Sequence, residues 1–332
     1  MNIDTPQYGW YAVARSKDLK RKKPLKIVLF GIPLVLFGSP KVPRILRDQC
    51  PHRGAALSEG RKIGEKIECP YHGWRFDGLG NLTEMPCLIG DLPHIKAQPF
   101  EVSIAMGLVF VKIGDVDGLP YKNPYAEKIK FWRPMPGGAN TTLVDAAENF
   151  LDITHTMVVH KNILRSSKHQ TPTRVIGSAK GNEALVQYYG EGDAGGVVSA
   201  LLHERDRVVS VGRFVGPNIA EVEFHGPKGP NFIMTGYLTP IDENNVGGFG
   251  MLGLPGPKWW AWLKYLILYP FIHLVHNQDK KILASVNRNR KIGGKFRDVI
   301  GPLDFIRPQI DAIILGKTPP AQQAPFESEI NL

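Results

Sequence analysis

Two short loops that each combine a cysteine with a histidine are the most constraining feature of the chain. The first reads Cys50-Pro-His52 and the second reads Cys69-Pro-Tyr-His72, with sixteen residues between them. Each loop can supply one thiolate and one imidazole to a shared metal centre. A [2Fe–2S] cluster with two thiolates on one iron and two imidazoles on the other uses this ligand set, and its neutral imidazoles raise the reduction potential. The loops therefore predict a one-electron redox centre.

A structural zinc site is the main alternative, because two cysteines and two histidines also complete a tetrahedral shell. Zinc modules usually take both cysteines from one knuckle and both histidines from another, whereas here each loop supplies one of each. Pro51 and Pro70 stiffen the loops, and neighbouring glycines allow turns in which backbone amides approach sulfur. These features favour the iron–sulfur cluster.

The stretch CPHRGAALSEG (50–60), followed by CPYHGWRFDGLGNL (69–82), closely resembles the Rieske domain of the Rieske non-haem iron oxygenases. The similarity runs over nearly the whole chain and is strong at these loops and at a second motif. The resemblance implies an N-terminal all-β Rieske [2Fe–2S] domain and a C-terminal helix-grip-type catalytic domain, in an α+β chain. It assigns the cluster to Cys50, His52, Cys69 and His72.

The length of 332 residues predicts two domains. Up to about residue 118 the sequence reads as short strands joined by glycine and proline turns, which indicates a small antiparallel β domain. Residues 119–140 are rich in proline and contain a Gly-Gly pair, so the boundary is placed at 120. We predict a Rieske domain over 1–120 and a mononuclear iron catalytic domain over 121–332.

The second domain is predicted to combine a curved antiparallel sheet with long helices. A helix is expected over 142–160, six strands with regular turns over 172–253, and further helices over 257–290 and 303–315. Such an arrangement can enclose one apolar cavity. The segment from Lys317 onward, rich in Pro and Gln, is expected to be a loosely held tail.

The helix expected over 142–160 carries the pattern E-N-x-x-D-x-x-H-x4-H. Glu148, Asp152 and His155 recur at i, i+4 and i+7 beside apolar residues, where unpaired polar groups are costly and metal ligation would relieve the cost. His155 and His160 are five positions apart, about 140° round a regular helix. They can share a metal only if the helix ends or bulges between them.

This pattern resembles the mononuclear iron motif of the same oxygenases. The resemblance implies that His155, His160 and a carboxylate from a late helix bind Fe(II) and leave positions open for O₂ and substrate. Asp279 is the candidate carboxylate, and apolar residues at 3/4 spacing around it place it independently on the apolar face of its helix. The alternative ligands are His273, His276 and Asp304.

The resemblance also assigns roles beyond ligation. In the family, the electron crosses from the cluster of one subunit to the iron of the next. His72 of one subunit would hydrogen-bond Asp152 of its neighbour, and Asp152 would contact His155, so a homotrimer is implied. Asn149 is expected near the iron without binding it, and Glu148 at a subunit contact or on the helix surface.

Two such centres imply a terminal oxygenase that uses O₂. The short chain and early Rieske domain favour monooxygenation or oxidative demethylation over dihydroxylation, on an apolar substrate that is aromatic or sterol- or lipid-like. No strand leads into a G-x-G-x-x-G turn and a helix, so electrons from NAD(P)H are expected through a separate reductase, with or without a ferredoxin. The alternatives are a Rieske electron-transfer or binding protein without the second iron, and a zinc-stabilised lipid-binding protein.

Charge and cysteine usage add limits on partners and compartment. The formal charge is +10, with basic runs over 17–26 and 280–291. These fit an acidic electron donor or an anionic membrane surface; nucleic acid is disfavoured because aromatic residues are not interleaved with the basic ones. Cys87 is left over, so a disulfide framework is not expected. Without a secretory signal at the N-terminus, the cytoplasm is the expected compartment.

The apolar run WWAWLKYLILYPFIHLV (259–275) allows more than one structural interpretation. It is short for a membrane span and is interrupted by Lys264, Pro270 and His273. We expect a helix buried in the catalytic domain. Its Trp and Tyr residues also permit a peripheral membrane contact through which an apolar substrate could enter.

Overall fold

The computed structural model describes residues 8–165, 171–191, 198, 207–293 and 298–332. The first residues of the N-terminus, on which the expected absence of a secretory signal partly rests, lie outside this range. The chain divides into two compact units. One comprises Met1–Lys122 with Thr239–Asp242, and the other comprises Asn123–Leu238 with Glu243–Leu332.

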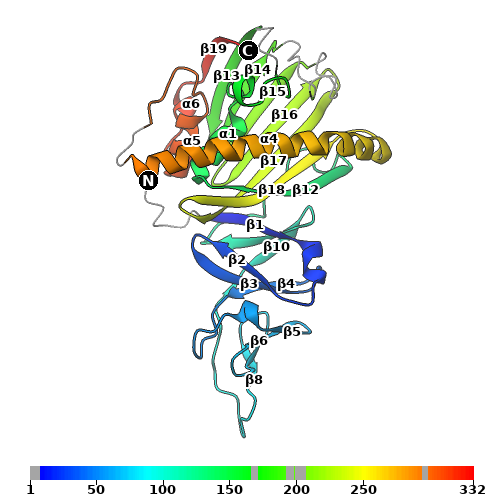
Figure 1. Cartoon of the computed structure of the whole chain (residues 1–332), viewed down its shortest axis with the longest axis vertical. Coiled ribbons are helices and arrows are strands. Elements are labelled where there is room, and N and C mark those ends of the chain that lie inside the picture. Colours follow the sequence, from blue (N-terminus) through cyan, green and yellow to red (C-terminus); the bar gives the residue numbers. More distant parts are fainter. Residues whose placement is uncertain (1–7, 166–170, 192–197, 199–206, 294–297) are drawn as a thin grey trace. The chain divides into compact units, whose positions relative to one another are not determined.

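The first unit is built from short antiparallel strands, as its alternation of apolar runs with turns predicts (Figure 1). Its described sheets have the strand orders β1-β11-β10, β2-β3-β4-β9 and β5-β6-β7-β8. The short 3₁₀ helices are η1 (Ser16–Lys20) and η2 (Leu57–Glu59). The strands are β1 (Gly9–Arg15), β2 (Leu25–Leu29), β3 (Ile32–Gly38), β4 (Pro43–Arg47), β5 (Arg61–Ile63), β6 (Lys66–Glu68), β7 (Arg75–Phe76), β8 (Leu82–Glu84), β9 (Pro99–Phe100), β10 (Val102–Ala105) and β11 (Leu108–Ile113).

Strand β3 is apolar on both faces because it packs between two hydrophobic clusters. Leu34 and Leu36 point into a cluster with residues of β1 and β11. Val35 and Phe37, which alternate with them, point into a second cluster that contains the two loop cysteines. This strand therefore supports the cysteine-histidine loops from inside the unit.

The second unit contains one antiparallel sheet of eight strands in the order β12-β18-β17-β16-β15-β14-β13-β19. Strands β13 to β18 follow one another in space as they do in the sequence, so the predicted meander is confirmed. The strands are β12 (Phe131–Ala139), β13 (Pro172–Lys180), β14 (Glu183–Tyr189), β15 (Val209–Val215), β16 (Ile219–Gly226), β17 (Gly229–Asp242), β18 (Asn245–Leu254) and β19 (Phe326–Asn331).

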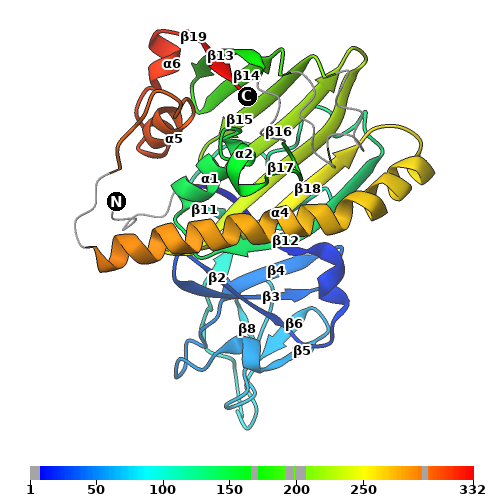
Figure 2. The same cartoon turned by 45° about the horizontal axis from the view of Figure 1, so that its top comes forward.

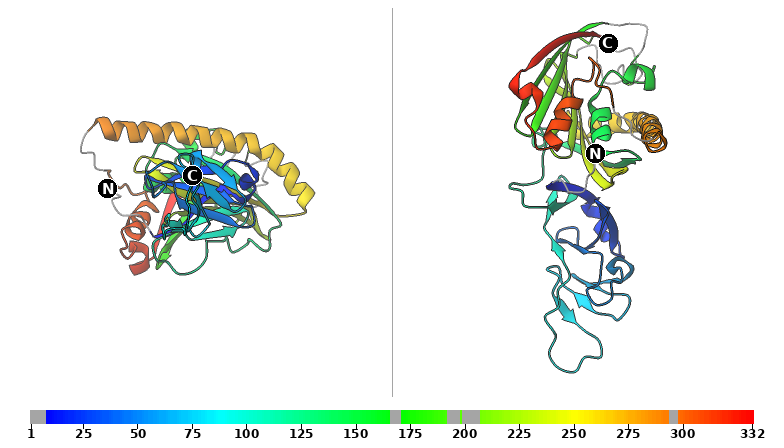
Figure 3. Two further views of the ribbon diagram at one scale, coloured as in Figure 1. Left: turned by 90° about the horizontal axis from the view of Figure 1, so that it is seen from below. Right: turned by 90° about the vertical axis from the view of Figure 1, so that its left-hand side faces the viewer.

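Helices cover one face of this sheet (Figures 2 and 3). Helix α1 packs on β15 and β16, and the long helix α4 packs on β12 and β18. The described helices of the unit are α1 (Leu143–Leu151), α2 (Thr156–Val159), α4 (Lys258–Ile292), α5 (Arg307–Ile314) and α6 (Pro320–Gln323). The predicted α+β class is thereby confirmed.

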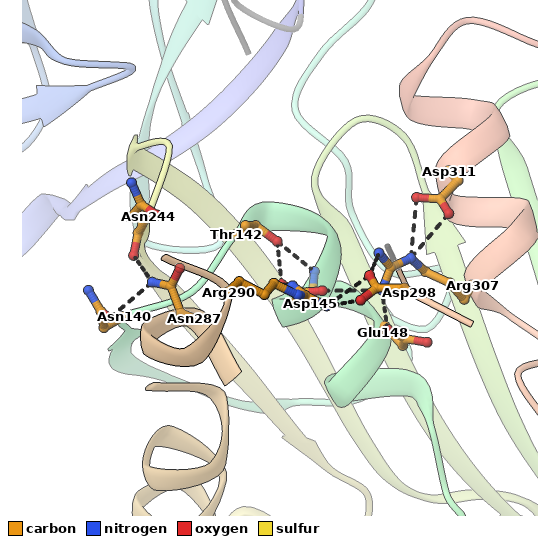
Figure 4. Close-up of polar contacts among 10 residues, drawn as sticks. All are labelled: Asn140, Thr142, Asp145, Glu148, Asn244, Asn287, Arg290, Asp298, Arg307 and Asp311. Carbon is orange, nitrogen blue, oxygen red and sulfur yellow. Dashed lines mark hydrogen bonds and ion pairs between the residues drawn. The ribbon is translucent and has the colours of Figure 1, made fainter. Parts of the chain in front are cut away.

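An ion-pair network joins α1, α5 and the end of α4 (Figure 4). Arg307 donates to Asp145, Glu148 and Asp298, and Arg290 donates to Asp145 and Asp298. Burial raises the pKa of Glu148 although Arg307 opposes that shift. Glu148 is thus paired within its own chain, although we expected it at a subunit contact or on the helix surface.

The prediction of a single helix over 142–160 is wrong, because this segment forms the two helices α1 and α2. Helix α1 ends at Leu151, and Asp152 takes an extended conformation with φ −73° and ψ 122°. The Asp152 carboxylate accepts hydrogen bonds from the N–H groups of Thr154 and His155, at 2.7 and 3.2 Å. This local bonding competes with the helix and ends it, so the chain restarts as the separate helix α2.

Two predictions about the C-terminal region are also wrong. The segment from Lys317 is not a loose tail, because it forms α6 and then β19, which pairs with β13 and buries Ile330. The run 259–275 forms the first half of α4 as expected, but that half is not buried. Among its large side chains only Leu268 is fully covered, since α4 forms the outer layer on the sheet and presents one side to it.

Candidate cluster and metal sites

The two cysteine-histidine loops have the same backbone construction. In each loop the cysteine N–H, of Cys50 or Cys69, donates to the carbonyl five residues later, at 2.8 Å in both cases. The N–H of Gly54 or Gly73 donates back to the cysteine carbonyl, at 2.9 and 3.2 Å. Both glycines have positive φ, +77° and +70°, which other residues adopt only with strain. The spacing C-x3-G in both loops is therefore a requirement of this turn.

The four side chains of these loops fit a [2Fe–2S] cluster. The rings of His52 and His72 lie with their centroids 4.7 Å apart and their planes at 54°, and Cys50 and Cys69 are buried. The Nδ1 atom of His52 is buried and has no hydrogen-bond partner among the described residues. A buried nitrogen without a partner costs free energy, and a metal would supply the missing bond. Burial raises the pKa of the Cys50 thiol to about 11 in the metal-free chain, and a bound metal would deprotonate it.

Further residues hold the loops in place, and sequence reasoning did not identify them. Trp74 stacks on His52 with centroids 4.4 Å apart and 4° between the ring planes. Asp48 is buried and accepts hydrogen bonds from the N–H and the hydroxyl of Ser58, both at 2.6 Å. Asp48 and Ser58 thus bridge the two ends of the first loop. Neither residue type carries a sequence signal for this task.

The second unit brings His155, His160 and Asp279 together. The Oδ1 atom of Asp279 lies 3.0 Å from Nε2 of His160 and 3.5 Å from Nε2 of His155. One potential ligand atom from each of the three residues lies within 4.8 Å of the others. Two imidazoles and one carboxylate on one side of a metal are the donor set of a non-haem Fe(II) site with open positions.

The helix break explains how two histidines five positions apart can converge. His155 precedes the short helix α2 and His160 ends it, with φ −111° and ψ 31°. Their rings lie 5.2 Å apart at an interplanar angle of 74°. Asp279 comes from the middle of α4. The alternative ligands His273, His276 and Asp304 do not join the group.

Each histidine has an acceptor behind its other nitrogen. Asp152 Oδ2 lies 3.2 Å from His155 Nδ1, and Gln278 Oε1 lies 2.8 Å from His160 Nδ1. An acceptor at Nδ1 keeps the proton there and leaves the Nε2 lone pair for a metal. Asn149 Nδ2 donates to Asp279 Oδ1 at 3.4 Å. Gln278 was missed by sequence reasoning, because only the packing of α4 brings it behind His160.

The electrostatics of the metal-free group reflect this crowding. Burial opposes ionisation of His155, but its hydrogen bonds to Asp152 and Asp279 raise its pKa to about 9. Burial likewise opposes ionisation of Asp279, and the two histidines lower its pKa to about 2. The two carboxylates thus favour a positive charge among these side chains, which a bound cation would supply.

The three-residue group lies at the wall of a cavity of about 320 Å³. The lining is predominantly apolar and comes from the sheet, from α1 and from one side of α4. Representative lining side chains are Met135, Phe224, Phe232, Met234, Leu268 and Phe271. The cavity can therefore hold an apolar molecule beside the metal-binding group.

One part of the cavity wall is charged. Arg165 and Arg207 line the cavity and both pair with the buried carboxylate of Glu191, Arg207 at 3.0 Å. The Arg207 guanidinium also packs over the ring of Phe224, 4.1 Å from its centroid. Two guanidinium groups therefore share the Glu191 carboxylate at this part of the wall. This cluster was not predicted from the sequence, because its members lie far apart along the chain.

Comparison with known proteins identifies the class of the first domain. Residues 9–96 match the family described as the Rieske [2Fe-2S] domain, so this part of the chain is a Rieske domain. The match covers the two loops but not the second unit.

Relatives extend the similarity beyond that domain. The chain is 33% identical over 135 residues to 4beta-methylsterol monooxygenase of Methylococcus capsulatus, covering 38% of this chain and 36% of that protein. It is 31% identical over 168 residues to the oxygenase component of 3-ketosteroid-9-alpha-monooxygenase of Rhodococcus rhodochrous, covering 46% and 41%. It is 29% identical over 206 residues to chloroplastic Protein TIC 55 of Arabidopsis thaliana, covering 58% and 38%. The chain thus spans about two fifths of the length of these curated relatives.

The fold matches along almost the whole chain. The crystal structure of dicamba monooxygenase bound to 3,6-dichlorosalicylic acid superposes with a TM-score of 0.79 at 20% identity, covering 93% of this chain and 96% of that one. These comparisons confirm the resemblance to the Rieske oxygenases that the two motifs indicated.

Proposed function

We propose that this chain is the terminal oxygenase of a multicomponent Rieske system. The observation that carries the proposal is the group of His155, His160 and Asp279 at the wall of an apolar cavity, in a chain that also contains a Rieske domain. We assign the Rieske domain to 1–120 and the catalytic domain to 121–332. In this assignment Cys50, His52, Cys69 and His72 hold the cluster.

In the proposed mechanism, His155, His160 and Asp279 would hold Fe(II), which would supply the centre for O₂ reduction with electrons from the cluster. Asp152 and Gln278 hold the protons of the two imidazoles at Nδ1, so that both Nε2 atoms stay available as ligands. Asn149 orients the Asp279 carboxylate through its amide. The apolar walls orient the substrate and exclude water from it.

We propose hydroxylation or oxidative demethylation of an apolar substrate, with monooxygenation favoured over dihydroxylation. The names of two relatives, a methylsterol monooxygenase and a ketosteroid monooxygenase component, support an apolar ring system as substrate class. The apolar cavity lining supports the same class. Electrons would come from NAD(P)H through a separate reductase, with or without a ferredoxin, and the net charge of +10 suits an acidic donor. We place the enzyme in the cytoplasm, because its cysteines do not suggest a disulfide framework.

We further propose that the chain forms a homotrimer in which Asp152 receives the electron from a neighbouring subunit. His72 is exposed and the Asp152 side chain is 28% exposed, so each is accessible to another protein surface. Asp152 contacts His155 directly. A hydrogen bond from His72 of one subunit to Asp152 of the next would connect the two metal centres.

The test begins with metal and sulfide counts on anaerobically purified protein. Three irons and two acid-labile sulfides per chain, with the rhombic electron paramagnetic resonance signal of a reduced Rieske cluster, are expected. Two irons with the same signal would indicate an electron carrier without the second iron site. A colourless zinc protein would overturn the proposal. Turnover is then measured with methylsterols, ketosteroids and methoxylated aromatic acids and a surrogate reductase.

The Asp152 role has a separate test. Asp152→Asn should retain three irons and the cluster signal. In a single-turnover experiment that starts from the reduced cluster, its product yield should be at least 100-fold lower than that of wild type. Asp115→Asn, a matched change at an exposed carboxylate, should retain activity. Sedimentation analysis should give a trimer for both variants. Equal activity of Asp152→Asn and wild type would refute the bridging role.

A further inference from the structure

The first half of α4 exposes a continuous set of large apolar side chains. They recur every three or four residues along the helix, so they lie on one side of it. Their exposed fractions lie between 39% and 70%. We name this set the α4 apolar surface; its members are Trp259, Trp260, Trp262, Leu263, Leu266, Ile267, Tyr269 and Leu274.

The other side of the same half-helix lines the cavity. Leu268, Phe271, Ile272 and Val275 contribute to the cavity wall. The first half of α4 is therefore apolar around its circumference, with one side towards the cavity and another towards the outside. A helix of this kind is normally buried on all sides, so its exposed side calls for an apolar environment that the described residues do not provide.

Side-chain chemistry identifies that environment. No helix in the described part of the chain, α4 included, is long and apolar enough to cross a membrane. Trp and Tyr prefer the boundary between lipid tails and headgroups, because their rings are apolar and their N–H or O–H groups are polar. The α4 apolar surface contains three Trp and one Tyr.

The charges around this surface fit anionic lipid headgroups. Residues 258–278 contain no Asp or Glu, and they contain Lys258 and Lys264. The Lys264 ammonium lies 5.8 Å from the ring centroid of Trp260, and the Arg133 guanidinium lies 5.3 Å from that of Trp262. Cations at the rim of an apolar patch are attracted to a negatively charged bilayer.

We propose that the α4 apolar surface docks on an anionic bilayer, with its rings at headgroup depth and with Lys258, Lys264 and Arg133 against lipid phosphates. Docking places the helix that lines the cavity at the membrane. If the proposed oxygenase function holds, its apolar substrate is a membrane-dissolved molecule that reaches the cavity beside α4. The docking itself does not depend on that function.

The experiment measures binding of the full-length, cluster-loaded protein to sucrose-loaded vesicles by sedimentation. Vesicles of phosphatidylcholine with 30% phosphatidylglycerol are compared with vesicles of phosphatidylcholine alone. Wild type should bind the anionic vesicles, and 0.5 M salt should weaken binding at least threefold, since it screens the headgroup charge. Brominated lipids should quench its tryptophan fluorescence.

The variant Trp259→Ser/Trp262→Ser/Leu266→Ser should lose at least tenfold in vesicle affinity. The control Ile89→Ser/Leu119→Ser/Ile292→Ser removes three apolar side chains outside the α4 apolar surface, each more exposed than those changed in the first variant, and should bind like wild type. Lys258→Glu/Lys264→Glu should lose affinity for the anionic vesicles only. Iron and sulfide counts on each variant verify folding.

Three results would overturn the proposal. One is a wild type that binds neither kind of vesicle, and another is an equal loss in the apolar variant and its control. The third is a wild type that does not bind vesicles but self-associates in a concentration-dependent manner, with self-association lost only in the apolar variant. That result would assign the surface to a second copy of the chain. Because vesicle binding is measured without substrate or reductase, an inactive enzyme that binds vesicles would refute the oxygenase function and leave the docking intact.

Discussion

At the scale of single residues, the second site depends on what lies behind each imidazole. His160 is almost fully buried, and its Nδ1 atom has Gln278 Oε1 at 2.8 Å. Replacing Gln278 by Leu removes that acceptor, so His160 can take the tautomer that blocks its Nε2 lone pair. We expect affinity for Fe(II) to fall by about 10- to 100-fold, the usual cost of losing such a partner. Competition titration with a colorimetric chelator measures it.

The neighbouring amide provides the control. Asn277 precedes Gln278 on α4 and is exposed, so Asn277→Leu makes the same type of change on another side of the helix. Its iron affinity should equal that of wild type. Equal affinities for Gln278→Leu and Asn277→Leu would show that His160 does not need its amide partner.

Glu191 shows how much a buried charge depends on its partners. Burial opposes its ionisation, but Arg207 and Arg165 lower its pKa below the usual value of 4.5. Glu191→Gln removes the buried charge that both guanidinium groups share, and we expect the free energy of unfolding to fall by about 3–5 kcal/mol. Because the folded pKa is lowered, this stabilisation is complete well above pH 4.5 and is lost as the pH falls through the folded value. Urea unfolding at pH 7 and at acid pH measures both effects.

An exposed ion pair is the appropriate comparison for Glu191. Arg174 and Glu327 pair on the surface, with side chains 58% and 59% exposed. Glu327→Gln should change the free energy of unfolding by less than about 1 kcal/mol, because water screens the pair. If both variants lost the same amount, burial would not be the cause.

At the scale of elements, the sequence predicts most strands and helices because period-2 and 3.6-residue patterns are local properties. The departures occur where a side chain acts against the pattern. The apolar spacing over 142–160 continues past Asp152, but the Asp152 carboxylate bonds the following backbone and ends the helix. The apolar run 259–275 predicts a buried helix, but apolar spacing alone does not show which sides of a helix pack against other elements.

Strand β19 was missed because its sequence, FESEIN, is short and polar. Its stability comes from pairing with β13 and from Ile330, which is 8% exposed in the main cluster of the second unit. Ile330→Ala should lower the free energy of unfolding by about 2–5 kcal/mol, the cost of a cavity in a packed core. Thermal unfolding followed by circular dichroism measures the loss.

The adjacent exposed residue tests whether the strand is buried on one face only. Glu329 points away from the cluster, so Glu329→Ala should leave the unfolding midpoint within about 2 °C of wild type. No loss in Ile330→Ala would mean that this segment is the loose tail that its composition indicated. A large loss in Glu329→Ala would mean that the strand is buried on both faces.

At the scale of the whole molecule, the two proposed metal centres differ in how far their candidate ligands are separated along the chain. The loops of 50–72 lie close in sequence and share one turn geometry, so their pattern is visible without a structure. Asp279 and Gln278 meet His160 only because α4 packs across the sheet, at a sequence separation of 118 residues for Gln278. Periodicity could place Asp279 on an apolar face, but it could not say which residues that face meets.

The same difference predicts how each centre should respond to chelation. Cys50 and Cys69 are each 2% exposed and lie in turns closed by backbone hydrogen bonds, whereas the side chains of His155 and Asp279 are 19% and 17% exposed at the cavity wall. A ferrous chelator should therefore remove one of three irons per chain and leave both sulfides and the cluster signal unchanged. Iron counts and electron paramagnetic resonance spectra, taken before and after gel filtration, measure this.

A variant can reproduce that state without a chelator. His155→Ala/His160→Ala removes two proposed ligands and should purify with two irons, two sulfides and an unaltered cluster signal, because the cluster loops pack in a core of their own. Adding Fe(II) should restore the third iron to chelated wild type but not to the variant. If chelation removed sulfide together with iron, the cluster would be the labile centre, and three irons in the variant would place the third one away from these histidines.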